Sequence, residues 1–170
     1  MTVLVTAATK NGSTGEIAQA IGAALTRRGV PAVVMAPDEV QDISGYDAVV
    51  LGSAVYSGHW MPAATTLVER CSHAWAGRPV WLFPSGPIGK PGRSLTTKMG
   101  ADPVDLPKMR AATGARQHRM FPGKLDKKDV GPVQRIGLTL FGMQGDFRDW
   151  DAVRTWSAGI ADALHETPTR

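Results

Sequence analysis

The hydrophobic positions of this chain follow two patterns that alternate along the sequence, one typical of strands and one typical of helices. Four short apolar runs predict strands at 3–8, 32–35, 48–53 and 80–83. The third shows no alternation, as expected for a strand covered on both faces by helices. Between these runs, apolar residues recur at helical spacing, as Ile17, Ile21 and Leu25 do. Strands that alternate with helices predict a parallel α/β sheet with right-handed crossovers.

Glycine, proline and aspartate mark the expected ends of the helices. A first helix is predicted from Glu16 to Arg28, stopping at Gly29, and a second from Pro62 to Gly77. A third is expected between a cap at Asp105 and a stop at Gly114.

The second half of the chain is predicted to complete the fold. Asp149 is expected to cap a last helix that buries Val153, Trp156, Ile160 and Leu164. A short helix is predicted over 131–143, and a polar edge strand near 116–121. Five strands in 170 residues favour one flavodoxin-like, doubly wound domain over 1–170, with helices on both faces and strand order 2-1-3-4-5. This topology places a ligand where strands one and three part.

The loop between the first strand and the first helix is the best candidate binding segment. It consists of Thr9, Lys10, Asn11, Gly12, Ser13 and Thr14. Hydroxyls and free amides at the positive end of a helix can bind a phosphate dianion. The alternative is a capping box formed by Ser13 and Glu16, which needs no ligand. A receiver-type domain is excluded, since 6–9 supply no carboxylate.

Two further loops should frame a flavin ring above the same edge of the sheet. They contain Ser53, Ala54, Val55, Tyr56, Ser57, Gly58 and Trp60, and then Ser85, Gly86, Pro87, Ile88 and Gly89. Tyr56 and Trp60 offer rings for stacking, although each could equally be an ordinary core or surface aromatic. Three loops of suitable chemistry in this order predict FMN as the cofactor, with no catalytic side chain and no metal.

Composition limits the binding partners and the cellular location that we expect for this protein. The formal charge is +4, and the basic excess is concentrated in 110–135. Without an aromatic stacking series, this segment does not indicate nucleic-acid binding, but it suits an anionic partner, a membrane leaflet or simple solvation. The single cysteine, Cys71, is expected in the core. No apolar run is long enough to span a bilayer, and the strand begins directly after Met1-Thr2, so we expect a cytoplasmic protein without a signal peptide.

Three segments resemble the flavodoxin-domain proteins that are related to menaquinone-dependent protoporphyrinogen oxidases. They are 8–18, 51–60 and 145–150, the last with the Asp-Trp pair that opens the final helix. The resemblance implies noncovalent FMN, oxidation of a reduced organic substrate and a quinone acceptor. It also implies an insertion at about 122–149, which could contact the inner face of the membrane or close over the core as an ordinary helix. The 84–103 loop and the insertion depart from the family pattern.

Two other functions fit the same residues. One is a non-enzymatic electron carrier of the flavodoxin type, which would present an acidic face. The other is a module that binds a flavin or deazaflavin without turnover.

Overall fold

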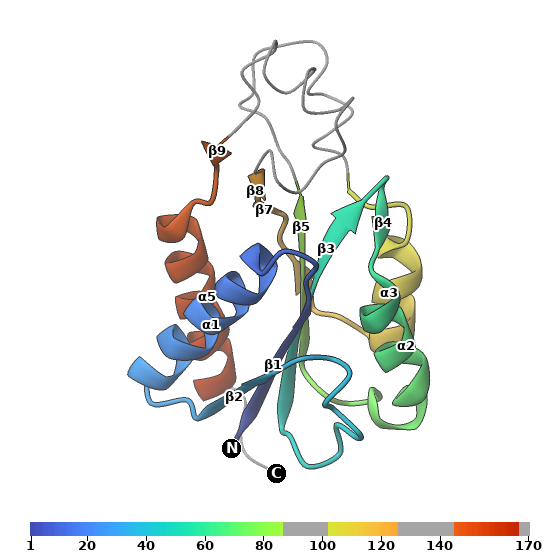
Figure 1. The fold of residues 1–170 in the computed structure, drawn as a ribbon. Coiled ribbons are helices and arrows are strands. Elements are labelled where there is room, and N and C mark those ends of the chain that lie inside the picture. The colour runs from blue at the N-terminus through green and yellow to red at the C-terminus, as the bar shows by residue number, and fades with distance from the viewer. Residues whose placement is uncertain (87–101, 126–144, 167–170) are drawn as a thin grey trace, which may run out of the picture.

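The computed structural model describes residues 1–86, 102–125 and 145–166, which form a sheet with helices on both faces (Figure 1). The parallel strands are β1 (Val3–Ala8), β2 (Ala32–Met35), β3 (Ala48–Tyr56), β5 (Val80–Gly86), β6 (Gln117–His118) and β7 (Phe121–Pro122). Two antiparallel pairings add β4 (His59–Trp60) to β3, and β8 (Lys124–Leu125) to β9 (Gly145–Asp146). The helices are α1 (Ser13–Arg27), α2 (Pro62–Arg70), α3 (Leu106–Thr113) and α5 (Trp150–His165).

The sheet has the order β2-β1-β3-β5-β6, with β4 and β7 attached to β3 and β5. The predicted order 2-1-3-4-5 is recovered when β4 is left aside and β6 and β7 are counted as one interrupted strand. Both halves keep one register against β5, because His118 pairs with Leu82 and Phe121 pairs with Ser85. The predicted α/β fold is therefore confirmed.

The core lies in two layers, one on each face of the sheet. On the α1 and α5 side, Phe83, Phe121 and Trp156 pack edge to face, with ring centroids 5.5 to 6.3 Å apart. On the α2 and α3 side, Cys71 is buried, as the sequence predicted, and so is Trp75. Burial raises the pKa of the Cys71 thiol, which keeps it protonated and unreactive.

Several elements end at different residues from those predicted. Strands β3 and β5 run three residues further, because Ser53 and Ala54 continue the ladder with Pro84 and Ser85. Helix α2 ends at Arg70, and a 3₁₀ turn over Ser72–Ala74 replaces its predicted last turn. The Asp149 cap is confirmed, since its Oδ1 accepts a hydrogen bond from the Ala152 amide at 2.8 Å. The predicted helix over 131–143 lies outside the described residues.

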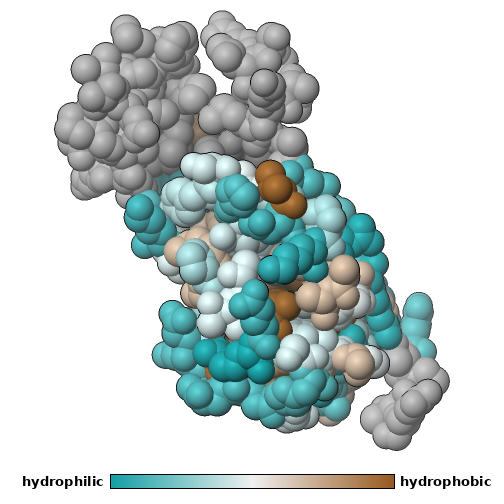
Figure 2. Space-filling view, turned by 90° about the vertical axis from the view of Figure 1, so that its right-hand side faces the viewer, coloured by the Kyte–Doolittle hydropathy of each residue, from teal (hydrophilic) through white to brown (hydrophobic). Residues whose placement is uncertain are grey.

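The side of the molecule covered by α2 and α3 is mostly hydrophilic, and hydrophobic residues appear on it only as separate spots (Figure 2). The described large apolar side chains with high exposure are scattered over the chain: Met1, Val33, Tyr56 and Val104. Among residues 1–86, 102–125 and 145–166, no helix combines the length and the apolar character that a membrane crossing requires.

Candidate functional site

The carboxyl ends of β1, β3 and β5 lie side by side at one edge of the sheet (Figure 1). Register places Ala8 beside Ser53, and Ala54 beside Ser85. The segments that follow these strands therefore begin next to one another, about 4.8 Å apart from strand to strand. This is the edge at which the sequence predicted a ligand.

The turn from β1 into α1 does not form the capping box that the sequence allowed. Gly12 is the N-cap, in a left-handed conformation with φ of 85°, and no side chain from the described part of the chain caps the helix. Glu16 instead receives a hydrogen bond from Arg148. Within the described residues, the first amides of α1 therefore have no hydrogen-bond acceptor, and they stand at the positive end of the helix dipole.

Thr9 supplies the second feature of an anion site in this turn. Its Oγ1 is buried and has no hydrogen-bond partner in the described structure. The Thr9 side chain lies over Gly15, since a Cβ added to Gly15 would lie 3.3 Å from Thr9 Cγ2. Burying a hydroxyl without a partner costs about 1–3 kcal/mol, so such an atom calls for an explanation. A bound phosphate oxygen would satisfy it.

The other predicted phosphate residues differ in their accessibility. Lys10 and Asn11 are exposed, Ser13 is half-buried and Thr14 is buried. The Lys10 ammonium lies 5.5 Å from the centre of the Tyr56 ring. This contact joins the first loop to the end of β3.

The segment after β3 is a hairpin and not the open loop that we predicted. Ala54, Val55 and Tyr56 belong to β3, and Ser57 and Gly58 form the two-residue turn into β4. Both turn residues have positive φ, 52° and 82°, which is typical of a type I′ hairpin turn. The turn presents Tyr56, 44% exposed, at the strand-end edge.

Trp60 is buried, with 4% exposure, in the core layer beneath α2 and α3. Of the two interpretations left open for Trp60, the structure favours core packing, so its ring is not a free stacking surface beside Tyr56. The Asp105 carboxylate accepts a hydrogen bond from the Trp60 amide at 2.9 Å and lies 3.1 Å from His59 Nδ1. Asp105 occupies the predicted N-cap of α3, but its side chain does not cap that helix. The Trp60 amide and then His59 lower the pKa of Asp105.

Ser85, near the end of β5, provides another buried hydroxyl, and its Oγ has no hydrogen-bond partner among the described residues. Beside it, the Gly123 amide donates to the Gly86 carbonyl at 2.8 Å, and a Cβ on Gly123 would lie 3.2 Å from the same oxygen. Ser53 is satisfied, because its Oγ accepts from the Met61 amide and donates to the Ala54 carbonyl. Pro87, Ile88 and Gly89, also predicted for this site, lie outside the described residues.

The two ends of the predicted insertion, 122–149, meet at the same edge. Lys124 pairs with Asp146, and Leu125 with Gly145, in the β8–β9 ladder. Arg148, which the sequence did not single out, then contacts Asp146, Glu16 and the ring of Trp150. Hydrogen bonds from Arg148 lower the pKa of Asp146. No local pattern could have found the pair with Glu16, because 132 residues separate the two partners.

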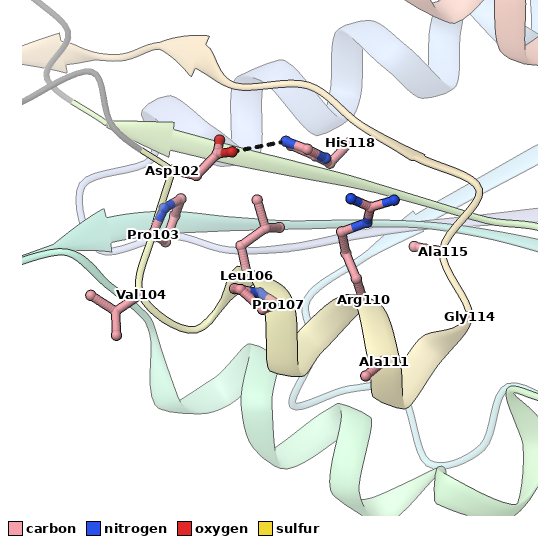
Figure 3. A pocket seen from close by; sticks show the side chains of 10 residues that line it. All are labelled: Asp102, Pro103, Val104, Leu106, Pro107, Arg110, Ala111, Gly114, Ala115 and His118. Atoms are coloured by element: carbon pink, nitrogen blue, oxygen red, sulfur yellow. Dashed lines mark hydrogen bonds and ion pairs between the residues drawn. The ribbon is translucent and has the colours of Figure 1, made fainter.

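A pocket of about 760 Å³ lies elsewhere, between α3 and β6 (Figure 3). Arg110 reaches into it from α3, while His118 and Asp102 form an ion pair of 3.2 Å on its other side. None of the predicted site residues lines this pocket. It is therefore separate from the strand-end site, and its Arg110 is one of the basic residues that the sequence pointed out.

Comparison with known proteins agrees with the fold. Residues 4–148 match the family described as flavodoxin domain. A flavodoxin from the domain Archaea superposes with a TM-score of 0.64 at 16% identity, covering 98% of this chain and 100% of that one. Oxidised flavodoxin 1 from Bacillus cereus gives 0.61 at 14% identity, covering 98% and 100%.

A longer protein of known structure and the curated proteins complete the comparison. Rubredoxin oxygen:oxidoreductase from the anaerobe Desulfovibrio gigas gives a TM-score of 0.63 at 16% identity, covering 96% of this chain but only 36% of its own. No curated protein matches. The match over 4–148 assigns the chain to the flavodoxin domain family, and this membership implies FMN as its cofactor.

Proposed function

We propose that this protein is an FMN-dependent oxidoreductase that moves electrons between a reduced organic substrate and a quinone-type acceptor. The observation that carries the cofactor part is the uncapped N-terminus of α1 beside the buried, unpartnered Thr9 hydroxyl. These groups would hold the FMN phosphate, with Gly12 allowing the backbone to turn toward it. Ser85 Oγ and the backbone around Gly86 would face polar atoms of the ring, and Tyr56 would stack on it.

Bound FMN would supply the electron chemistry, since it can accept two electrons from a substrate and pass them on. The protein residues would bind and orient it. Lys10 and Lys124 are exposed basic residues at or next to this edge. Positive charge close to a flavin stabilises its anionic reduced form and raises its potential.

Two features favour an enzyme over an electron carrier. The formal charge of +4 is opposite to the acidic face that a flavodoxin-type carrier would present. The resemblance over 8–18, 51–60 and 145–150 supports a quinone-linked oxidase of the protoporphyrinogen type. A basic edge would attract an anionic substrate.

The first experiment is the visible absorption spectrum of the purified protein, with mass analysis of whatever denaturation releases. A flavin spectrum and released FMN support the proposal. A colourless protein that also fails to take up added FMN would overturn it.

Stopped-flow kinetics then separates enzyme from carrier. The photoreduced protein should be reoxidised quickly by a menaquinone analogue, and protoporphyrinogen should be oxidised to its fluorescent porphyrin. Reoxidation only by iron–sulfur or haem proteins would identify a carrier. A protein that retains deazaflavin but not FMN would support the third function.

Membrane contact through 122–149 is a separate part of the proposal. The β8–β9 ladder supports it by bringing both ends of this segment to the strand-end edge. Sedimentation with anionic liposomes should carry the protein down, and lack of binding would dismiss this part alone.

A further inference from the structure

The Arg148 side chain is almost fully enclosed, although it lies in a surface segment. It is 7% exposed, whereas its partners Glu16 and Asp146 are 62% and 42% exposed. Its Nε donates to Asp146 Oδ1 at 2.8 Å, and its terminal nitrogens donate to Asp146 Oδ2 and Glu16 Oε2. The guanidinium also lies 4.6 Å from the centre of the Trp150 ring. Four contacts thus fix one cation against the first turn of α1.

Glu16 stands at a position where a negative charge has two opposite effects. Its amide donates to the Gly12 carbonyl at 2.9 Å, so it belongs to the first turn of α1. A carboxylate there stabilises the helix dipole, but it repels a phosphate dianion bound at the same helix end. Removal of the Arg148 cation would leave two neighbouring carboxylates, Glu16 and Asp146, without their shared partner.

We propose that Arg148 is a positioning residue for the phosphate-binding turn. It neutralises Glu16 and holds that carboxylate toward the 145–149 segment. The free amides of α1 and the Thr9 hydroxyl can then donate hydrogen bonds to a bound phosphate dianion. The inference rests on the proposed function, because it concerns the FMN phosphate.

A purely structural ion pair would behave differently. If Arg148 only anchored 145–149, its loss would weaken the binding of every flavin alike. A role at the phosphate must act on FMN and spare riboflavin, which has the same ring without the phosphate.

The test compares wild type with Arg148→Ala, Glu16→Gln and the double variant in titrations with FMN and riboflavin. Arg148→Ala should raise the FMN Kd about tenfold, equivalent to about 1.4 kcal/mol, and leave the riboflavin Kd unchanged. Glu16→Gln should restore FMN affinity in the double variant. Equal losses for both flavins, or no restoration, would overturn the proposal.

The chain offers a matched control at the other end of the same helix pair. Arg28 Nη1 lies 3.0 Å from Asp162 Oδ1 and links the end of α1 to α5. Arg28→Ala removes an ion pair between α1 and α5 at the opposite end of α1 from the phosphate turn, and it should leave the FMN-to-riboflavin ratio unchanged. A shift in the ratio equal to that of Arg148→Ala would overturn the proposal.

Inorganic phosphate tests Arg148 without any flavin. Phosphate should raise the thermal unfolding midpoint of wild type, and raise that of Arg148→Ala less. An equal rise, including none in either protein, would overturn the role of Arg148. Failure of wild type to bind FMN while this phosphate difference persists would instead remove the proposed function and keep the Arg148 inference.

Discussion

Substitution of Thr9 by valine separates a ligand-binding hydroxyl from a structural one. Thr9 Oγ1 is buried without a partner, so valine removes an unsatisfied polar atom and keeps nearly the same shape. Such a replacement is close to neutral or stabilising. We expect the free energy of unfolding of the flavin-free protein to change by less than about 1 kcal/mol, with any change upward.

The same substitution should harm FMN binding. A hydrogen bond to a charged group contributes about 1.5–3 kcal/mol, so loss of the hydroxyl should raise the FMN Kd about ten- to a hundredfold. Riboflavin affinity should stay unchanged, because riboflavin brings no phosphate to Thr9. Thr9→Val would thus weaken FMN binding while leaving the free energy of unfolding of the flavin-free protein unchanged or slightly raised.

Urea denaturation of the flavin-free protein and fluorescence titration with both flavins measure these effects. Thr6→Val is the matched control, since Thr6 Oγ1 is also buried without a partner but lies within β1. It should leave FMN affinity unchanged. An unchanged FMN Kd in Thr9→Val, or a loss of stability above about 1 kcal/mol, would refute the reasoning about this hydroxyl.

Three further predictions test the backbone and the charges around the site. Gly12→Ala should lower the free energy of unfolding by about 1–2 kcal/mol in urea denaturation, because φ is 85° there; no loss would contradict the left-handed turn. Gly52→Ala should lower the free energy of unfolding by about 1–3 kcal/mol or more, because its Cβ would lie 2.2 Å from the Phe83 ring. In Gly159→Ala, by contrast, the new Cβ in α5 would meet no atom within 4 Å, so this substitution should raise the free energy of unfolding by about 0.5–1 kcal/mol. Thermal unfolding of both variants gives the comparison, and equal midpoints would be inconsistent with it. The lowered pKa of Asp105 means that its stabilising contribution is complete above about pH 4 and is lost as the pH falls toward the folded-state pKa. Asp105→Asn should therefore reduce the loss in free energy of unfolding between about pH 4 and lower pH, as measured by urea denaturation at several pH values. An unchanged loss would exclude Asp105 as a cause of the acid destabilisation.

The sequence predicted the parallel strands well but placed their ends too early. The apolar runs at 48–53 and 80–83 were visible as buried strands, whereas the extensions to Tyr56 and Gly86 were not. Pro84, Ser85 and Gly86 resemble loop residues, and 54–56 lead directly into the Ser57-Gly58 turn. They become strand because neighbouring strands offer them hydrogen-bond partners, which is a property of the sheet and not of the segment.

The roles of side chains also divide into those that local sequence predicts and those that depend on distant residues. Local spacing was enough to identify Asp149 as a cap, because the Ala152 amide lies three residues away. The same reasoning allowed Ser13 and Glu16 to cap α1, and there it was wrong. Glu16 found a stronger, charged partner in Arg148. The Asp105 carboxylate likewise accepts a hydrogen bond from the Trp60 amide, 45 residues earlier in the chain, and does not cap α3.

By itself, the sequence determined the fold class, the two-sided core and the segment that ends β1, because hydrophobic period and turn chemistry are local properties. Only the tertiary structure decided which donors of that segment stay free. Whether a hydroxyl such as that of Thr9, or an amide at the start of α1, is already satisfied depends on side chains that arrive from distant parts of the chain. Those partners are chosen by the packing of whole helices and strands, which no local pattern encodes.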